Sequence, residues 1–183
     1  MRALLGFLPW IVYAIIATGD QWRYGAITGL VVAFALVAWD RRAGRAWDEI
    51  VIPTSATVFF AIITVVSFAW PETSLVRFGP ALVNLWLAGT AWGSLLIRRP
   101  FTLGIARTMA PPEVQEHPVF YRVNAVITAV WAAFFTVAAV ALAVVLGVDP
   151  HATVLVIAIK ALTFALPALF TVRYPKIVEA RYS

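Results

Sequence analysis

Lys160 is the residue whose type and surroundings most suggest chemistry, because it is a basic side chain inside a long apolar stretch. It lies roughly 12 Å of helix rise from the nearer end of that stretch, too deep for its amine to reach the headgroup layer easily. Asn84 is predicted at a similar depth in an earlier apolar stretch that runs in the same direction. Ionisable and amide side chains at this depth either hold helices together or line the path of a ligand.

No carboxylate of this chain is available to Lys160, because all nine acidic residues fall outside the predicted spans. Three alternatives follow. In the first, desolvation leaves the Lys160 amine uncharged. Otherwise the amine forms hydrogen bonds with Asn84, with threonine hydroxyls and with carbonyls freed near Pro167, or it binds an anion or a lipid headgroup. The absence of a buried carboxylate disfavours a proton- or cation-coupled carrier. The candidates for a ligand or ion path are Lys160, Asn84, Arg77, Asn124 and Thr163.

A second group of candidates lies in a basic, aromatic loop that follows the fourth apolar stretch. Arg98, Arg99 and Arg107 stand near Phe101 where the chain should leave the lipid. This combination is typical of contacts with the anionic headgroups of membrane lipids. Docking of a partner protein is the alternative, because the same side chains serve both purposes.

A short helix lying in the headgroup layer is expected in this loop. Thr102 is placed to cap it, and Phe101, Ile105 and Met109 would share one side of it. An amphipathic helix of this kind lies in the plane of the membrane surface.

Composition places the chain among multi-pass membrane proteins. It is 62% hydrophobic and 13% charged, with a mean hydropathy of +0.89, whereas soluble domains are about half apolar and a quarter charged. A soluble protein of 183 residues could not bury so much apolar surface. The net charge of +5 is then typical of cytoplasmic loops rather than of a nucleic-acid-binding surface.

The apolar stretches predict an all-α fold, a bundle of six transmembrane helices in a single domain over residues 1–183. The first stretch is expected to be retained rather than cleaved as a signal peptide, because only one Arg precedes it. The expected spans are about 3–18, 24–39, 50–70, 75–97, 120–147 and 152–172.

The fourth span carries polar residues at intervals of seven. Arg77, Asn84 and Arg98 would share one helical face, since seven residues make nearly two turns. Gly79-Pro80 offers an alternative, in which the regular helix starts only there and Arg77 lies in the preceding turn. The fifth span places Asn124 on one face with a threonine, a tryptophan and a phenylalanine.

The distribution of basic residues predicts the orientation. Only Arg23 and Arg77 fall on one side of a six-span arrangement, Lys160 lies within a span, and all other Lys and Arg residues fall on the opposite side. The positive-inside rule therefore predicts that both termini are cytoplasmic.

Two GxxxG pairs, Gly25 with Gly29 and Gly89 with Gly93, are spaced so that another helix backbone could approach closely. Chance in a chain rich in Gly and Ala is the other interpretation. If both pairs are used, they favour an oligomer or a subunit of a larger membrane complex.

Sequence motifs for catalysis are missing. There is no cysteine, which excludes disulfides and thiolate metal sites. His117 and His151 are predicted on opposite sides of the membrane, so they would not share a metal. Neither a nucleotide-binding nor a hydrolase motif is present, and we expect a protein that is not an enzyme and that has no cofactor and no metal site.

Several short segments, in order along the chain, resemble the intracellular septation protein A family of bacterial inner-membrane proteins. The segments are Phe7-Leu8-Pro9, Arg77 to Asn84, Arg98-Arg99-Pro100-Phe101, Asn124 to Phe135, and Ile159 to Thr163. The spacing from Asn124 to Trp131 is longer than in the family, and the family's Gly after the Lys is replaced here.

The resemblance implies a non-enzymatic role in cell-envelope synthesis or division. The protein would act through envelope or division proteins, or through lipids, in the bacterial inner membrane. A small transporter or channel for an anionic or polar solute, with Lys160 and Asn84 on its path, is the alternative function.

Overall fold

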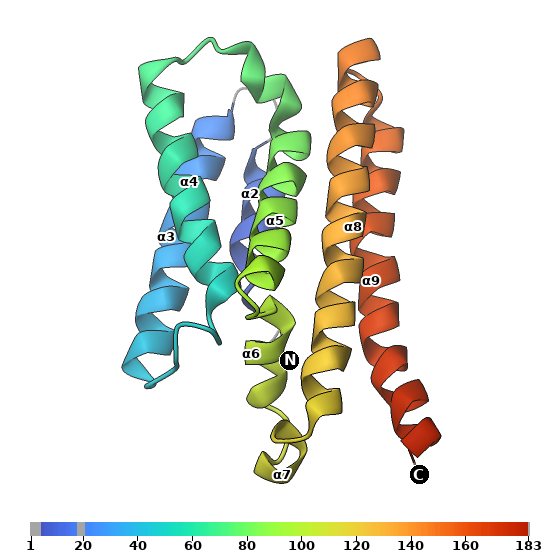
Figure 1. Ribbon diagram of the computed structural model, residues 1–183. Helices are drawn as coiled ribbons and strands as arrows, with labels where there is room; N and C mark the ends of the chain where they lie inside the picture. The colour runs from blue at the N-terminus through green and yellow to red at the C-terminus, as the bar shows by residue number, and fades with distance from the viewer. Residues whose placement is uncertain (1–4, 18–20, 183) are drawn as a thin grey trace. The chain divides into compact units, whose positions relative to one another are not determined.

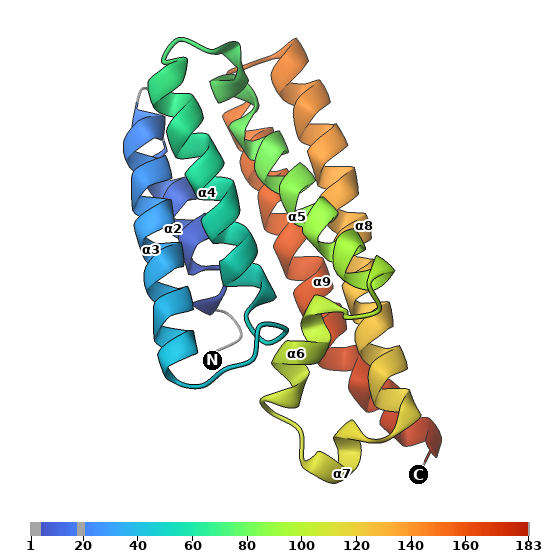
Figure 2. The same cartoon turned by 60° about the vertical axis from the view of Figure 1, so that its left-hand side comes forward.

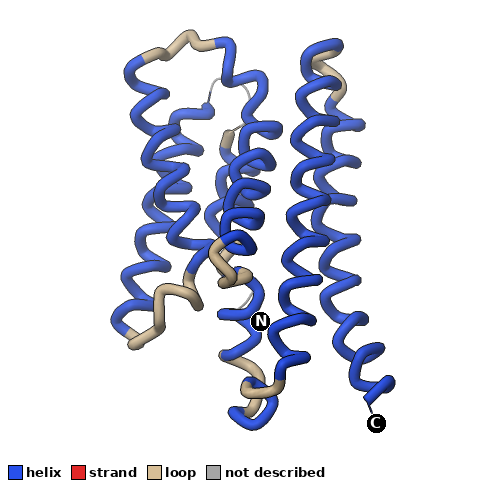
Figure 3. The backbone as a smooth tube through the Cα atoms, in the orientation of Figure 1, coloured by secondary structure: helices blue, strands red, loops and turns tan. Residues whose placement is uncertain are grey.

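The computed structural model describes residues 5–17 and 21–182, and it is all-helical (Figure 1). Helices make up 83% of it, and the described residues contain no β-strand (Figure 3). This confirms the predicted all-α class. The elements are α2 (Leu8–Ile16), α3 (Trp22–Arg42), α4 (Val51–Ala69), η2 (Ser74–Phe78), α5 (Gly79–Leu96), α6 (Phe101–Arg107), α7 (Pro112–Gln115), α8 (Pro118–Val148) and α9 (Thr153–Tyr182).

Four helices, α3, α4, α8 and α9, are each long and apolar enough to cross a membrane. A fifth candidate is made by Ser74–Leu96 together with α6, which are bent by 76° relative to each other. The first predicted span, 3–18, is described over residues 5–17 only, and its ends lie outside the described residues. The described part contains α2, whose nine residues rise only roughly 14 Å, against a hydrocarbon core of about 30 Å. The helices are compatible with a multi-pass membrane protein.

The chain divides into two compact units, Met1–Val76 and Arg77–Ser183. In the first unit, α3 packs against both α2 and α4. Trp10 on α2 lies with its ring centroid 5.0 Å from those of Phe59 and Phe60 on α4. These buried rings form the centre of the first unit.

The two GxxxG pairs differ in what they contact. A Cβ added at Gly25 would lie 2.8 Å from the Cβ of Ala17, and one added at Gly29 would lie 2.9 Å from the ring of Phe60. Both are closer than real Cβ atoms approach, so this pair is used for close packing. At Gly89 and Gly93 an added Cβ would meet no described atom within 4 Å.

In the second unit, α8 is the central helix, with α5 and α9 packed against it and the short α6 and α7 near its N-terminal end (Figures 1 and 2). One face of α8 is buried, including Asn124, Thr128, Trp131 and Phe135, which confirms the face predicted for the fifth span. Trp131 donates its indole N–H to the hydroxyl of Thr171 on α9 at 3.0 Å.

The fourth predicted span is shorter as a regular helix. α5 begins at Gly79, with Pro80 in its first turn, where a missing N–H costs little. Arg77 lies in the preceding 3₁₀ turn η2, and Arg98 follows the end of α5. The prediction that Arg77, Asn84 and Arg98 share one helical face is therefore wrong. The alternative prediction, that the regular helix starts at Gly79, is confirmed.

Candidate functional site

The bend between α5 and α6 encloses a network of buried hydroxyl groups. Ser94, in the last turn of α5, accepts a hydrogen bond from the backbone N–H of Phe101 at 3.1 Å. Thr102 donates to the carbonyl of Asn124 on α8 at 2.9 Å, and its Oγ1 lies 2.8 Å from that of Thr128. Because Thr102 has only one hydroxyl proton, Thr128 is the donor in that second bond. We call Ser94, Thr102, Thr128 and Asn124 the hydroxyl network.

The structure corrects two expectations for this loop. Thr102 does not cap α6, because Pro100 occupies the capping position and the Thr102 hydroxyl is bonded to α8. Phe101, expected at a lipid or partner surface, is only 2% exposed. Met109 lies after α6 and is exposed. Sequence reasoning missed Ser94 and Thr102 as network members, and their short side chains in an apolar setting were the available signal.

The turn after α5, which we call the basic turn (residues 97–100), ends the helix in a defined way. The backbone N–H of Arg98 donates to Leu95 and that of Arg99 donates to Ser94, at 2.9 and 2.8 Å. Arg98 has φ of 56°, the left-handed conformation of a Schellman helix end. Both arginine side chains are exposed, and neither has a hydrogen-bond or ion-pair partner among the described residues.

Arg107 lies in the last turn of α6, and its side chain is exposed. The side-chain amide of Gln115 donates to the carbonyls of Arg107 and Ala110, at 3.1 and 2.8 Å. This side chain ties the end of α6 to α7, so the backbone that carries Arg107 is also held in place.

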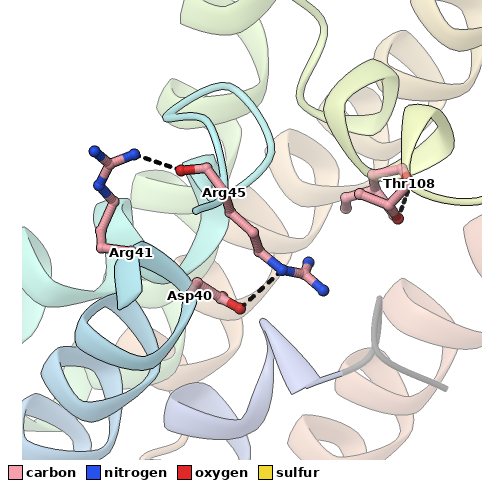
Figure 4. Close-up of polar contacts among 5 residues, drawn as sticks. Asp40, Arg41, Arg45 and Thr108 are labelled. Carbon is pink, nitrogen blue, oxygen red and sulfur yellow. Dashed lines mark hydrogen bonds and ion pairs between the residues drawn. The ribbon is translucent and has the colours of Figure 1, made fainter. Parts of the chain in front are cut away.

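At the end of α3 and in the loop that follows it, basic side chains interact with neighbouring groups of the same segment (Figure 4). Arg45 pairs with Asp40 at 3.2 Å. Arg41 donates to the carbonyl of Arg45 and lies over the ring of Trp47, 4.5 Å from its centroid. Arg41, in the last turn of α3, and Arg45, in the loop that follows, therefore have partners nearby, unlike Arg98 and Arg99.

Asn84 is buried in α5, with 4% of its surface exposed. Its side-chain N–H donates to the carbonyl of Pro80 one turn earlier, at 2.9 Å. Its Oδ1 is buried and has no hydrogen-bond partner. An unsatisfied buried acceptor of this kind costs about 1 to 3 kcal/mol of stability.

Lys160 is half-buried on α9 and makes no hydrogen bond or ion pair with the described residues. Ala81 on α5 and Val156 on α9 belong to one buried cluster with α8. Asn84 and Lys160 each follow those residues by about one turn, on helices that run in the same direction (Figure 1). They therefore lie at a similar level along α8, and no hydrogen bond joins them in the described structure.

None of the other three candidates forms a hydrogen bond with Lys160 in the described structure. Thr163 is buried, but its hydroxyl donates to the carbonyl of Ile159 on its own helix at 2.7 Å. Arg77 is exposed, and its guanidinium lies 4.6 Å from the ring centroid of Phe78. The Asn124 side chain donates to the carbonyl of Phe120 on its own helix at 2.9 Å, and only its backbone carbonyl joins the hydroxyl network, near the other end of α8. No hydrogen bond joins any two of the five candidates in the described structure. Thr163 lies one turn after Lys160 on α9, whereas Arg77 and Asn124 lie elsewhere in the second unit.

Metal-ligating side chains are scattered in the described part of the chain, where no group of three or more His, Asp or Glu is placed to hold an ion. The side chain of His117 accepts the backbone N–H of Val119 and caps α8. His151 lies 4.0 Å from Asp149 on an exposed turn.

Comparison with known proteins gives no relative: no family model, curated protein or solved structure matches this chain. The resemblance to the septation protein A family stays a prediction from short sequence segments. Function must therefore be argued from the geometry of the chain itself.

Proposed function

We propose that this chain is a non-enzymatic, multi-pass protein of the bacterial inner membrane that acts in cell-envelope synthesis or septation through contacts made at its basic turn. The observation that carries the proposal is that Arg98 and Arg99 are exposed, have no partner among the described residues, and stand on a hydrogen-bonded backbone. A preformed turn loses little conformational entropy on binding. Anionic headgroups or acidic side chains of a partner protein are the complementary groups.

The membrane arrangement that belongs to this proposal has six segments, with both termini cytoplasmic. The segment that contains α2 is the first, and α5 with its preceding 3₁₀ turn is the fourth. α6, bent by 76° from the segment before it, then lies along the cytoplasmic membrane surface. The distribution of basic residues supports this orientation.

Single cysteines test the arrangement directly, because the chain has none of its own. Cysteine at Glu72 or His151, both exposed, should react with a membrane-impermeant maleimide in cells whose outer membrane alone is permeable. Cysteine at Arg42 or Glu116 should react only after the inner membrane is opened. Labelling of Glu116→Cys before opening would contradict the proposed orientation.

A photo-crosslinking residue tests the contact. We expect a crosslinker at Ile97, which is 69% exposed beside Arg98, to capture envelope or division proteins in living cells. The same group at Val140, 61% exposed on α8, is the matched control and should capture lipid. Arg98→Gln with Arg99→Gln should abolish the protein adducts, and recovery of no envelope or division protein from Ile97 would refute the proposal.

A small transporter or channel for an anionic or polar solute is the second candidate. Two groups favour it, at a similar level along α8: the buried Asn84 Oδ1, which has no hydrogen-bond partner, and the half-buried Lys160 amine, which has none among the described residues. Such a transporter should lose flux in a Lys160→Met variant reconstituted in liposomes. Retained flux of small anions in that variant would remove Lys160 from the path.

A further inference from the structure

A hollow of about 450 Å³ opens between the first turn of α3 and the end of α4, entirely within the first unit. This volume lies within the range of small-molecule sites in proteins. The residues that line it are Trp22, Arg23, Tyr24, Ile27, Phe68 and Pro71. Neither the proposed function nor any predicted site uses this hollow.

Among the described residues that line the hollow, Arg23 alone is charged, and it has no hydrogen-bond or ion-pair partner among the described residues. Its position in the first turn of α3 is unfavourable for a cation, because the N-terminal end of a helix carries a partial positive charge. The first turn contains no acidic residue, and the Gln21 side chain does not cap it. The hollow therefore holds an arginine with no described direct partner, close to the positive end of the α3 dipole.

Apolar and aromatic groups form the rest of the wall. Trp22 is buried, while Tyr24 is 68% exposed and Phe68 is 63% exposed. Trp and Tyr are the side chains enriched at the level of lipid headgroups, where one end of the ring is apolar and the other is wet. An arginine among such rings suits a ligand that joins an anionic head to a hydrocarbon chain.

We propose that this hollow binds the headgroup phosphate of an anionic phospholipid, with Arg23 on the phosphate and Ile27 and Phe68 beside the upper acyl chain. Arginine recognises phosphate oxygens in a two-pronged geometry. The site requires only that α3 and α4 lie in a membrane, as in the proposed function, and it does not require the envelope role or the basic turn. In the proposed orientation it faces the outer leaflet.

The test uses the purified full-length protein in a neutral detergent, with thermal unfolding followed by circular dichroism. Short-chain phosphatidylglycerol should raise the unfolding midpoint, and phosphatidylcholine of the same chain length should raise it much less. Arg23→Gln should weaken phosphatidylglycerol binding by about tenfold, the size expected for one lost charge-assisted bond. Arg23→Lys should retain part of it, because the charge remains but the two-pronged geometry is lost.

Two controls separate this site from the other arginines. Arg77→Gln removes an exposed arginine predicted on the same side of the membrane, and Arg98→Gln with Arg99→Gln removes the charges of the basic turn. Arg77→Gln should keep the phosphatidylglycerol shift of the wild type. Arg98→Gln with Arg99→Gln should keep the part of that shift that Arg23→Gln removes, whatever the basic turn itself contributes. If only the Arg98 and Arg99 variant loses it, the basic turn binds the lipid and the hollow does not.

Inorganic phosphate distinguishes the two sources of a phosphate group. Sodium phosphate at matched ionic strength should leave the midpoint unchanged, because it cannot use the apolar wall. An equal shift with inorganic phosphate, lost in Arg23→Gln, would overturn the lipid assignment. An unaltered phosphatidylglycerol shift in Arg23→Gln would overturn the site itself, and Tyr24→Ala gives a second reading if Arg23→Gln folds poorly.

Discussion

Two sets of buried or half-buried polar side chains lie in the second unit, and they differ in how fully their hydrogen bonds are satisfied. In the hydroxyl network, Ser94, Thr102 and Thr128 bridge α5, α6 and α8 through bonds of 2.8 to 3.1 Å. At the level of Asn84 and Lys160, the Asn84 Oδ1 has no partner and the Lys160 amine has none among the described residues. The first set holds the helices together. The second set lowers the stability of the fold, which is typical of residues that serve a ligand.

The difference arises because the bend between α5 and α6 leaves backbone groups without helical hydrogen-bond partners, whereas the helix around Asn84 does not. Where α5 ends and α6 begins, backbone N–H groups lose their helical partners and need acceptors. Ser94 supplies one to Phe101, and Thr102 links the same turn to α8. At Asn84 the helix is regular, so every backbone group is already paired and an amide oxygen adds an unmet requirement. A buried network is stabilising only when all its members are satisfied.

The largest effect is expected from breaking the hydroxyl network. Thr128→Val removes the hydroxyl that donates a hydrogen bond to Thr102. Thr128 is fully buried, so water cannot replace the lost bond. We expect a loss of about 1 to 2 kcal/mol, or roughly 2 to 8 °C in the unfolding midpoint. Differential scanning fluorimetry of the purified protein in nanodiscs measures it.

Thr57→Val is the matched control for that substitution, because the Thr57 hydroxyl bonds only to the carbonyl of Pro53 on its own helix. It should change the midpoint little. The double variant Thr102→Val with Thr128→Val should cost less than the two single variants added together, because it leaves no unpaired hydroxyl. Additive costs would show that the two hydroxyls do not interact.

The opposite sign is expected at the second set. Asn84→Leu replaces a side chain whose Oδ1 is unsatisfied with an apolar one of the same branched shape and number of heavy atoms. We predict a gain of about 1 kcal/mol, because the penalty of the buried acceptor is removed. The unfolding midpoint of the purified protein in nanodiscs, followed by differential scanning fluorimetry, measures this gain. A loss of stability would show that Oδ1 has a partner in the membrane.

Coupling between Asn84 and Lys160 sharpens the comparison further. A double-mutant cycle of Asn84→Leu and Lys160→Met should give an interaction energy below about 0.5 kcal/mol, since no hydrogen bond joins the residues. The cycle is measured by the same unfolding midpoints. A larger favourable coupling would mean that the Lys160 amine reaches Oδ1, and that the pair holds helices together rather than serving a ligand.

The sequence predicts these two sets unequally, for physical reasons that particular residues show. Asn84 and the face of Asn124, Thr128, Trp131 and Phe135 follow from helical periodicity, and the start of α5 follows from Gly79 and Pro80. The role of Thr102 does not, because a hydroxyl in the first turn of a helix can cap it or bond elsewhere, and only the packing of α6 against α8 decides.

Helix ends show the same limit. Seven-residue spacing predicts one face for Arg77, Asn84 and Arg98 only if a single helix contains all three, and α5 contains Asn84 alone. Spacing within a span is local information, whereas the place where a helix stops depends on its capping bonds. The GxxxG pairs are similar: the spacing is the same, yet only Gly25 and Gly29 have close neighbours in the described structure.

The smallest expected effect is on stability, from glycine substitutions in the basic turn. They distinguish the contribution of the turn's backbone conformation from that of its charge. Arg98 has φ of 56°, where glycine carries no steric penalty. Arg98→Gly should therefore stabilise the protein by about 0.5 kcal/mol, after the lost attraction between Arg98 and the C-terminal end of α5 is subtracted. Arg99→Gly, without a left-handed residue to relieve, should destabilise it slightly.

These two glycine variants also test whether the basic turn acts through charge. Each removes one arginine, but only Arg98→Gly keeps or improves the Schellman turn that positions the other. If contact at the basic turn depends on positive charge, both variants should weaken crosslinking from Ile97 to a similar extent although their unfolding midpoints move in opposite directions. Crosslinking that follows the midpoints instead would mean that the turn contributes by its rigidity, and that the charges of Arg98 and Arg99 are not what the partner recognises.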